Sequence, residues 1–203
     1  MIDISADQVK MLRDRTGAGM MDCKRALQET GGDVDRAIDL LREKGLASVA
    51  KRAGRIADQG LIDSYIHFNN TVGVLIEVNS ETDFVAKTSE FQQLVKDIAL
   101  HIASPAAPRW LNREDIPTDV IQQEERIALA QAKEAGKPEN VLDRIVEGKL
   151  NAFYQDSVLL EQPYVKDDSK TIQQLLDEVA AKVGEKVAVR RFVRYKLGES
   201  TEA

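Results

Sequence analysis

Apolar residues recur at helical intervals along the first part of the chain. The stretches with this spacing are residues 5–15, 20–30 and 33–45, and glycines end each of them. Ser5 is a favourable N-cap for the first stretch, and Gln8 three residues later completes a capping box. The pattern therefore predicts three helices, whose small shared core would be only marginally stable on its own.

The pattern changes from helical spacing to β-rich runs in the next part of the chain. Residues 48–59 have clustered basic residues and no sustained apolar period, which indicates a solvated linker rather than a phosphate-binding patch. Residues 61–68 and 71–79 are two β-rich runs that flank Asn69 and Asn70. Asparagine tolerates the positive φ that a two-residue type I′ turn requires, so these runs predict a β-hairpin.

The remaining pattern completes a mixed fold. It predicts helices at residues 89–103, 118–135, 140–155 and 171–183, an extended piece at 158–165, a polar turn at 166–169 and a strand at 187–197. A hairpin alone is barely stable, so the late strand is expected to join it in a three-stranded antiparallel sheet packed by helices. The predicted fold class is therefore α+β.

These elements predict two domains. We expect a three-helix domain at residues 1–47, a linker at 48–59, an α+β core domain at 60–198 and a loose polar tail at 199–203. The size of the first domain and the glycines in its first loop are similar to those of ubiquitin-associated (UBA) domains.

Composition narrows the classes of partner. The chain has 203 residues and a formal net charge of -6, which gives no support to direct nucleic-acid binding through a basic surface. Cys23 is its only cysteine, so no intrachain disulfide can form. The beginning of the chain lacks a signal-peptide pattern, and no stretch approaches the roughly 20 apolar residues of a membrane span. We therefore expect a cytoplasmic protein with no membrane association.

The sequence offers little catalytic chemistry. It has no Gly-x-x-x-x-Gly-Lys-Ser/Thr motif, so no phosphate-binding loop of its own is expected. The two histidines, His67 and His101, are far apart in the sequence, and each is expected to be a surface residue or a hydrogen-bonded core residue. Cys23 is expected to be a small buried apolar residue. The chain is therefore not expected to be an enzyme or to hold a cofactor.

The segment at residues 79–87 is the most informative part of the chain. It connects the second β-rich run to a helix, and its polar residues suit a turn, but a turn does not need the large aromatic side chain of Phe84. Phe84 could be the first core residue of the next helix. Alternatively, a rigid turn could present it to a partner as an apolar wedge beside the Asp83 carboxylate. The local pattern leaves both interpretations open.

Three stretches resemble one known family. The run Thr-Asp-Phe-Val-Ala-Lys at residues 82–87 is similar to a signature of bacterial elongation factor Ts, the nucleotide-exchange factor of the GTPase elongation factor Tu. Residues 12–27 are similar to the amino-terminal signature of the same family, and residues 184–197 also fit it. Two long motifs in the family's order are far more specific than one short match. The resemblance covers nearly the whole chain.

The resemblance implies a fold and a set of contact residues. Members of this family begin with a UBA-like unit that docks on the GTPase domain of elongation factor Tu, and their Asp-Phe pair intrudes near its magnesium ion and nucleotide phosphates. By motif match, the residues implied to disturb the magnesium site are Thr82, Asp83, Phe84 and Val85. The implied docking residues are Arg13, Met20, Met21 and Lys24. The resemblance thus implies a guanine nucleotide exchange factor whose partner is Tu in its GDP-bound and nucleotide-free forms. Such a factor would promote GDP release from Tu and allow GTP to bind.

Met20 and Met21 also have a structural interpretation. Both could belong to the core of the three-helix domain, and Met21 is available for packing. However, adjacent residues on a helix diverge by about 100°, so at most one of them should point inward. The other is expected to be an exposed, adaptable apolar contact of the kind common at protein interfaces.

The end of the chain suggests self-association. Long members of the family continue into a second, related subdomain, whereas this chain resembles a short form. Its sheet at residues 187–197 would then have an uncovered flank, which a second copy could cover in a homodimer and a 2:2 complex with Tu. A rival function is that of a non-catalytic adaptor whose UBA-like domain binds a helical partner or a nascent chain.

Overall fold

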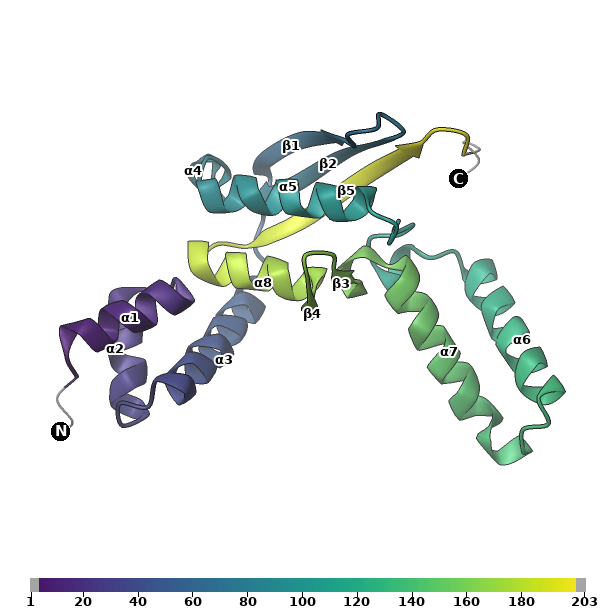
Figure 1. The fold of residues 1–203 in the computed structure, drawn as a ribbon, viewed down its shortest axis with the longest axis horizontal. Coiled ribbons are helices and arrows are strands. Elements are labelled where there is room, and N and C mark those ends of the chain that lie inside the picture. The colour runs from purple at the N-terminus through teal and green to yellow at the C-terminus, as the bar shows by residue number, and fades with distance from the viewer. Residues whose placement is uncertain (1–3, 200–203) are drawn as a thin grey trace. The chain divides into compact units, whose positions relative to one another are not determined.

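The computed structural model describes residues 4–199, and Figure 1 shows the course of the chain. The three predicted amino-terminal helices are present as α1 (Ala6–Thr16), α2 (Met20–Glu29) and α3 (Val34–Arg52). Ser5 and Gln8 form the predicted capping box of α1. These helices share a small core, which consists of Val9, Leu12, Cys23, Ala26, Leu27 and Ala37.

Helix α3 is longer than the sequence predicted. The predicted end at Gly45 is wrong, because the helix continues to Arg52. A glycine inside a helix costs only about 1 kcal/mol relative to alanine, and the favourable helix formers that follow it, including Leu46 and Ala47, offset that cost. Helix α3 therefore enters the segment predicted to be a linker, while the predicted domain boundaries themselves stay a prediction.

A three-stranded antiparallel sheet confirms the predicted α+β class. Its strands are β1 (Gln59–Ile66), β2 (Val72–Ser80) and β5 (Val187–Lys196), and their order is β1-β2-β5. On β2, the alternate residues Val72, Val74, Ile76 and Val78 are buried. Strand β5 thus pairs with the hairpin, as the sequence predicted, and continues the sheet on the β2 side.

The hairpin turn differs from the predicted type. A type I′ turn needs positive φ at both central residues, but within residues 4–199 only Asn70 and Ala107 among the non-glycine residues have positive φ. The turn is instead closed by a 2.8 Å bond from Asn70 N to His67 O, and Asn70 has φ 56°. The Asn69 side chain is occupied elsewhere, since its Oδ1 accepts from the N and Oγ1 of Thr71. The hairpin therefore uses a longer loop.

The remaining elements are mostly helical. They are α4 (Asp83–Ala86), α5 (Ser89–Ala103), η1 (Arg113–Asp115), α6 (Thr118–Glu134), η2 (Glu139–Val141), α7 (Leu142–Ser157), η3 (Leu159–Glu161), β3 (Pro163–Tyr164), β4 (Asp167–Thr171) and α8 (Ile172–Val183). Helices α6 and α7 pack together as the predicted antiparallel pair. Thr171 and Gln174 form the predicted capping box of α8.

A small sheet was missed at the sequence level. Strands β3 and β4 pair antiparallel, with Tyr164 opposite Asp167. The predicted polar turn at residues 166–169 is wrong, because the turn is formed by Val165 and Lys166 and the polar residues after it belong to β4. These residues lack the apolar alternation from which strands are recognised.

Contacts divide the chain into two compact units. The first comprises Met1–Leu61, Asn79–Gln92 and Leu176–Ala188, and the second comprises Ile62–Val78, Gln93–Leu175 and Val189–Ala203. Residues 200–203 of the predicted tail lie outside the described part of the chain. Within residues 4–199, no helix is long and apolar enough to cross a membrane.

The second unit contains a buried histidine whose ring nitrogens are both hydrogen-bonded. His101 is completely buried; its Nε2 lies 2.8 Å from Gln162 Oε1, and its Nδ1 accepts from Val165 N at 3.2 Å. The Gln162 Nε2 group donates to Ala106 O and Asp156 O, which directs Oε1 toward the histidine. Nδ1 is thus an acceptor, the neutral ring fits this site, and burial lowers the pKa of His101. Of the two expected positions, a surface residue or a hydrogen-bonded core residue, His101 takes the second.

We expect His101 to make the protein less stable in mild acid. Its pKa in the folded state is lowered from 6.5, so below that pH the unfolded chain binds a proton more readily than the folded chain. The free energy of unfolding should be highest above pH 6.5 and fall, by at most about 1.4 kcal/mol per pH unit, as pH drops toward the folded-state pKa. Urea unfolding of the wild type and His101→Gln over this range measures the slope. An equal slope in both proteins would contradict the assignment.

Candidate functional site

The turn after β2 is held by a short hydrogen-bonded helix. Thr82 has extended backbone angles and caps α4, its Oγ1 accepting from Val85 N at 3.4 Å. The Ser80 hydroxyl donates to Thr82 O at 2.8 Å. Helix α4 contains only four residues, and α5 begins shortly after it, with Thr88 Oγ1 accepting from Phe91 N. The chain therefore leaves the sheet through a defined turn.

The side chains of α4 point in two directions. Val85 and Ala86 are buried, with exposed fractions of 8% and 7%, whereas Phe84 is 78% exposed. The interpretation of Phe84 as a core residue is therefore wrong, since Val85 and Ala86 take that place. Successive residues of a helix are rotated by about 100° around its axis, so Phe84 faces solvent when Val85 and Ala86 face the core. The structure thus presents an aromatic ring to solvent on an anchored turn.

A carboxylate lies beside this ring in the sequence. Asp83 is exposed and pairs with Lys87, whose Nζ lies 2.6 Å from Asp83 Oδ2. The hydrogen bond from Lys87 holds the pKa of Asp83 below its usual value. Asp83 is therefore ionised at neutral pH, and the side chains of both Asp83 and Lys87 are exposed to solvent.

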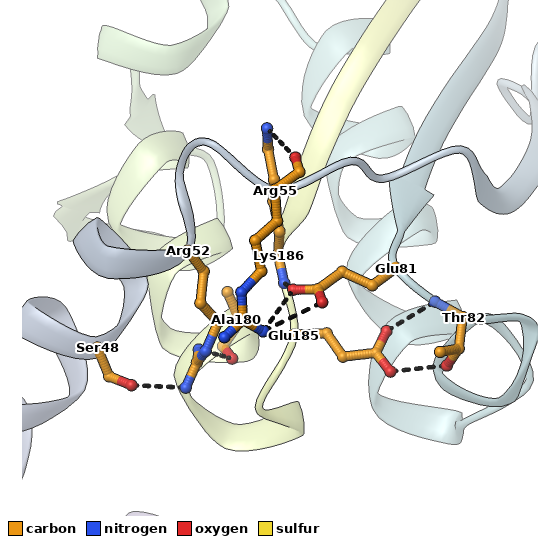
Figure 2. A network of polar contacts seen from close by, with 8 residues as sticks. All are labelled: Ser48, Arg52, Arg55, Glu81, Thr82, Ala180, Glu185 and Lys186. Atoms are coloured by element: carbon orange, nitrogen blue, oxygen red, sulfur yellow. Dashed lines mark hydrogen bonds and ion pairs between the residues drawn. The ribbon is translucent and has the colours of Figure 1, made fainter.

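Residues 185–186, which follow α8, form a network of hydrogen bonds with the turn. Figure 2 shows that the Glu185 carboxylate accepts two hydrogen bonds from Thr82, one from its backbone N at 3.0 Å and one from Oγ1 at 2.7 Å. Glu81 accepts from the backbone N of Lys186 at 2.6 Å. Its Oε2 also lies 3.2 Å from an Arg55 guanidinium nitrogen, and these donors lower the pKa of Glu81, the Lys186 amide most. Two carboxylates therefore connect residues 81–82 with residues 185–186.

The same network reaches the end of α3. The Lys186 Nζ group donates to Ala53 O at 2.6 Å and to Arg55 O at 2.9 Å. The Arg52 guanidinium donates to Ala180 O at 3.2 Å and to Ser48 Oγ at 2.6 Å (Figure 2). Arg52 and Arg55 are therefore bound to specific acceptors, so the interpretation of the segment as a merely solvated cluster is wrong for Arg52, while the Arg55 side chain remains 54% exposed.

The network residues were largely missed at the sequence level. Glu185 lies directly after Gly184, within a run that resembled the family, but nothing in the local pattern indicated a contact with Thr82. The sequence signal near Glu185 is Gly184, because a glycine commonly ends a helix and the chain then turns away from it. In the structure Gly184 has φ +78° and follows the last residue of α8. A hydrogen bond between a carboxylate and a distant backbone amide leaves no periodic pattern in the sequence from which it could be predicted.

All of the predicted docking residues are exposed. Arg13 lies on α1, and Lys24 lies on α2 with the two methionines. Met20 and Met21 are 54% and 65% exposed, so the expectation that Met21 packs in the core is wrong. Helix α2 buries Cys23 and its neighbours further along, and its first turn extends beyond the small core. Both methionines are thus available to a partner, in the same compact unit as α4.

Cys23 and His67, the remaining residues considered for chemistry, each have a local contact. Cys23 is fully buried, with its Sγ 3.8 Å from Ala18 O, which confirms the expected small buried residue. His67 Nδ1 lies 3.1 Å from the Tyr65 hydroxyl. In the described part of the chain, no group of three or more His, Cys, Asp or Glu side chains is placed to bind a metal ion.

Comparison with known proteins identifies the family. Residues 24–199 match the family model described as Elongation factor TS. The chain is 56% identical over 202 residues to Elongation factor Ts of Desulforamulus reducens, which covers all of this chain and 93% of the relative. It is 57% identical over 198 residues to Elongation factor Ts of Geobacter metallireducens, covering 98% of this chain and 91% of the relative. The match with Elongation factor Ts of a Thermoanaerobacter species is 56% over 199 residues, covering 98% of this chain and 97% of the relative. The chain therefore belongs to the elongation factor Ts family of translation factors.

Proposed function

We propose that this protein is a guanine nucleotide exchange factor for elongation factor Tu in the cytoplasm. The observation that carries the proposal is Phe84, a 78% exposed aromatic side chain on a turn whose backbone is hydrogen-bonded on both sides. An exposed phenylalanine on a fixed backbone costs little conformational entropy when it binds, and aromatic residues are typical anchors of protein interfaces. Asp83 adds a negative charge next to it.

In the proposed mechanism, the two parts of the first unit have different tasks. The exposed residues of α1 and α2, among them Arg13, Met20, Met21 and Lys24, dock on Tu. Phe84 then inserts near the magnesium ion and phosphates of the bound GDP, with Asp83 beside it and with Thr82 and Val85 shaping the turn. A carboxylate near a magnesium–phosphate site changes its electrostatics strongly only at short range. Docking must therefore precede the disturbance of the nucleotide.

The thermodynamics of such a factor are reciprocal. If binding of this chain weakens the affinity of Tu for GDP by some factor, GDP must weaken the affinity of Tu for this chain by the same factor. The chain therefore accelerates exchange in both directions and does not choose the product. An excess of GTP over GDP sets the direction of the reaction.

One experiment separates this function from that of an adaptor. An immobilised exchange factor should retain one dominant GTPase from a bacterial lysate and release it when GDP and magnesium are added, as the reciprocity requires. An adaptor for helical partners or nascent chains should be indifferent to both ligands. Retention of a GTPase that GDP and magnesium do not release would contradict the proposal.

We also propose that the protein forms a non-covalent homodimer, which would give a 2:2 complex with Tu. In the second unit, apolar side chains at alternate positions of the three strands are exposed: Ile62 at 61%, Ile66 at 60%, Leu75 at 49%, Val193 at 38% and Tyr195 at 64%. A second copy brings an identical apolar patch, so a two-fold contact would cover both. Cys23 is buried on α2, so a disulfide plays no part.

A charge at the centre of this patch should dissociate the dimer. Leu75 lies on β2, the middle strand, so Leu75→Lys places a cation on each copy within the contact, where its desolvation is costly. Analytical ultracentrifugation at micromolar concentration should give a dimer for the wild type and a monomer for the variant. Phe68→Lys, in the hairpin turn, is the control and should leave the dimer intact. A wild type that sediments as a monomer throughout would contradict the proposal.

A further inference from the structure

Helix α4 is too short to be stable without support from outside it. It contains four residues, and formation of the first helical turn is unfavourable because several dihedral angles are fixed for one hydrogen bond. Phe84 is 78% exposed, and of the four side chains of α4 only those of Val85 and Ala86 are buried. The orientation in which Phe84 is presented must therefore depend on further contacts of the turn.

Glu185 supplies these contacts through one side chain. Its two carboxylate oxygens accept from the backbone N and the Oγ1 of Thr82, the residue that caps α4. The Thr82 Oγ1 in turn accepts from Val85 N, so a continuous relay of hydrogen bonds runs from the helix to the carboxylate. Hydrogen bonds in such a chain polarise and strengthen one another, and those to an ionised acceptor are the strongest. Glu185 thus fixes both the backbone and the cap of the turn.

The position of Glu185 is itself well defined. It lies between the αL glycine Gly184, which ends α8, and Val187, where β5 begins. Its neighbour Lys186 donates its backbone N to Glu81, the residue before Thr82. The two segments therefore exchange carboxylate–amide hydrogen bonds in both directions, which restricts rotation of one relative to the other.

We propose that Glu185 is a positioning residue for nucleotide exchange, which holds Thr82 so that α4 presents Asp83 and Phe84 to the partner GTPase in one fixed orientation. This inference rests on the proposed function. Glu185 need not touch the partner: its effect is to remove the entropy cost of ordering α4 at the moment of binding. A turn that must first be ordered would bind more weakly in the state that displaces GDP, even though the docking helices are unchanged.

The first test measures exchange rates. Glu185→Ala should lower the limiting rate of Tu-bound GDP release by about tenfold or more, since hydrogen bonds to a charged group are lost. The concentration that gives half the limiting rate should change much less, because α1 and α2 still dock. Glu185→Gln keeps one acceptor oxygen and should recover part of the rate. Glu134→Ala removes an exposed carboxylate from α6 and should behave as the wild type.

The second test needs no GTPase. Amide hydrogen exchange of the free protein should become faster at residues 82–86 in Glu185→Ala, whereas α1 and α2 should keep their protection and the melting temperature should change little. A Thr82→Val variant, which keeps the shape but not the hydroxyl, should show a smaller increase. Unchanged protection of α4 in Glu185→Ala would overturn the inference.

A combined variant distinguishes positioning from general stability. If Glu185 acts only through the presentation of Asp83 and Phe84, then Glu185→Ala should have little further effect on GDP release in an Asp83→Ala/Phe84→Ala background. Additive losses would overturn the inference. If the wild type itself failed to accelerate GDP release, the proposed function would fail. A wild type that accelerates release, with Phe84→Ala slow and Glu185→Ala normal, would leave the function intact and remove the role of Glu185.

Discussion

Phe84→Ala should leave the protein folded and remove most of its ability to stimulate GDP release. Truncation of a buried phenylalanine typically costs about 3–5 kcal/mol, but this side chain is 78% exposed, and such substitutions usually change stability by no more than about 0.5 kcal/mol. The stimulated rate should fall by at least about tenfold, as expected for an aromatic anchor at an interface centre. Stopped-flow release of fluorescent GDP from Tu, with a thermal melt of the variant, measures both effects.

The hairpin turn offers a matched control for this substitution. Phe68 is 86% exposed and belongs to the other compact unit, so Phe68→Ala removes the same side chain from a surface that is not part of the proposed insertion. It should stimulate GDP release like the wild type. Asp83→Ala should be slower than the wild type but less impaired than Phe84→Ala. A Phe84→Ala protein that melts normally and releases GDP at the wild-type rate would refute the role of the turn.

The second large effect is expected at the docking helices. In a Met20→Ala/Met21→Ala variant, two exposed apolar contacts are lost from the first turn of α2. Interface anchors typically cost more than about 1 kcal/mol each when truncated, so the concentration for half-maximal stimulation should rise by about ten- to a hundredfold. The limiting rate at saturation should stay near that of the wild type, because Phe84 and its turn are intact.

This separation of affinity from limiting rate is the informative part of the result. Leu46→Ala, which truncates a 45% exposed apolar residue on α3, is the control and should change neither parameter. If the double methionine variant instead lowered the limiting rate at unchanged half-maximal concentration, α2 would act on the nucleotide site rather than in docking. Unchanged kinetics in both parameters would remove the methionines from the interface.

The fold could be predicted well where it follows from periodicity and capping. The three amino-terminal helices, the hairpin with its third strand, and the α8 capping box all have local signals, such as Ser5 with Gln8 and Thr171 with Gln174. Predictions failed where a single residue type was given too much weight. Gly45 was expected to end a helix that continues to Arg52. The Asn69–Asn70 pair was expected to form a two-residue type I′ turn, but of the two only Asn70 has a positive φ.

The candidate site was predictable only in part. The pattern singled out Phe84 but could not distinguish a core residue from an exposed one. An aromatic residue after a polar turn fits the start of a buried helix face and an exposed contact equally well. The exposed fraction of Phe84 and the burial of Val85 decide between them. The support of the turn could not be predicted, since Glu185 and Thr82 are 103 residues apart in the sequence. Contacts of this range depend on tertiary packing rather than on local propensity.

The proposed exchange activity is tested most directly by the rate of GDP release from elongation factor Tu as a function of the concentration of the wild-type chain. Fluorescent GDP bound to Tu is mixed with the protein and excess unlabelled GDP, and the loss of signal is followed by stopped flow. The rate is expected to rise with protein concentration to a plateau well above the spontaneous rate, and the acceleration should be equal when GTP is the competing nucleotide. A release rate that stays at the spontaneous value at every concentration would contradict the proposed activity.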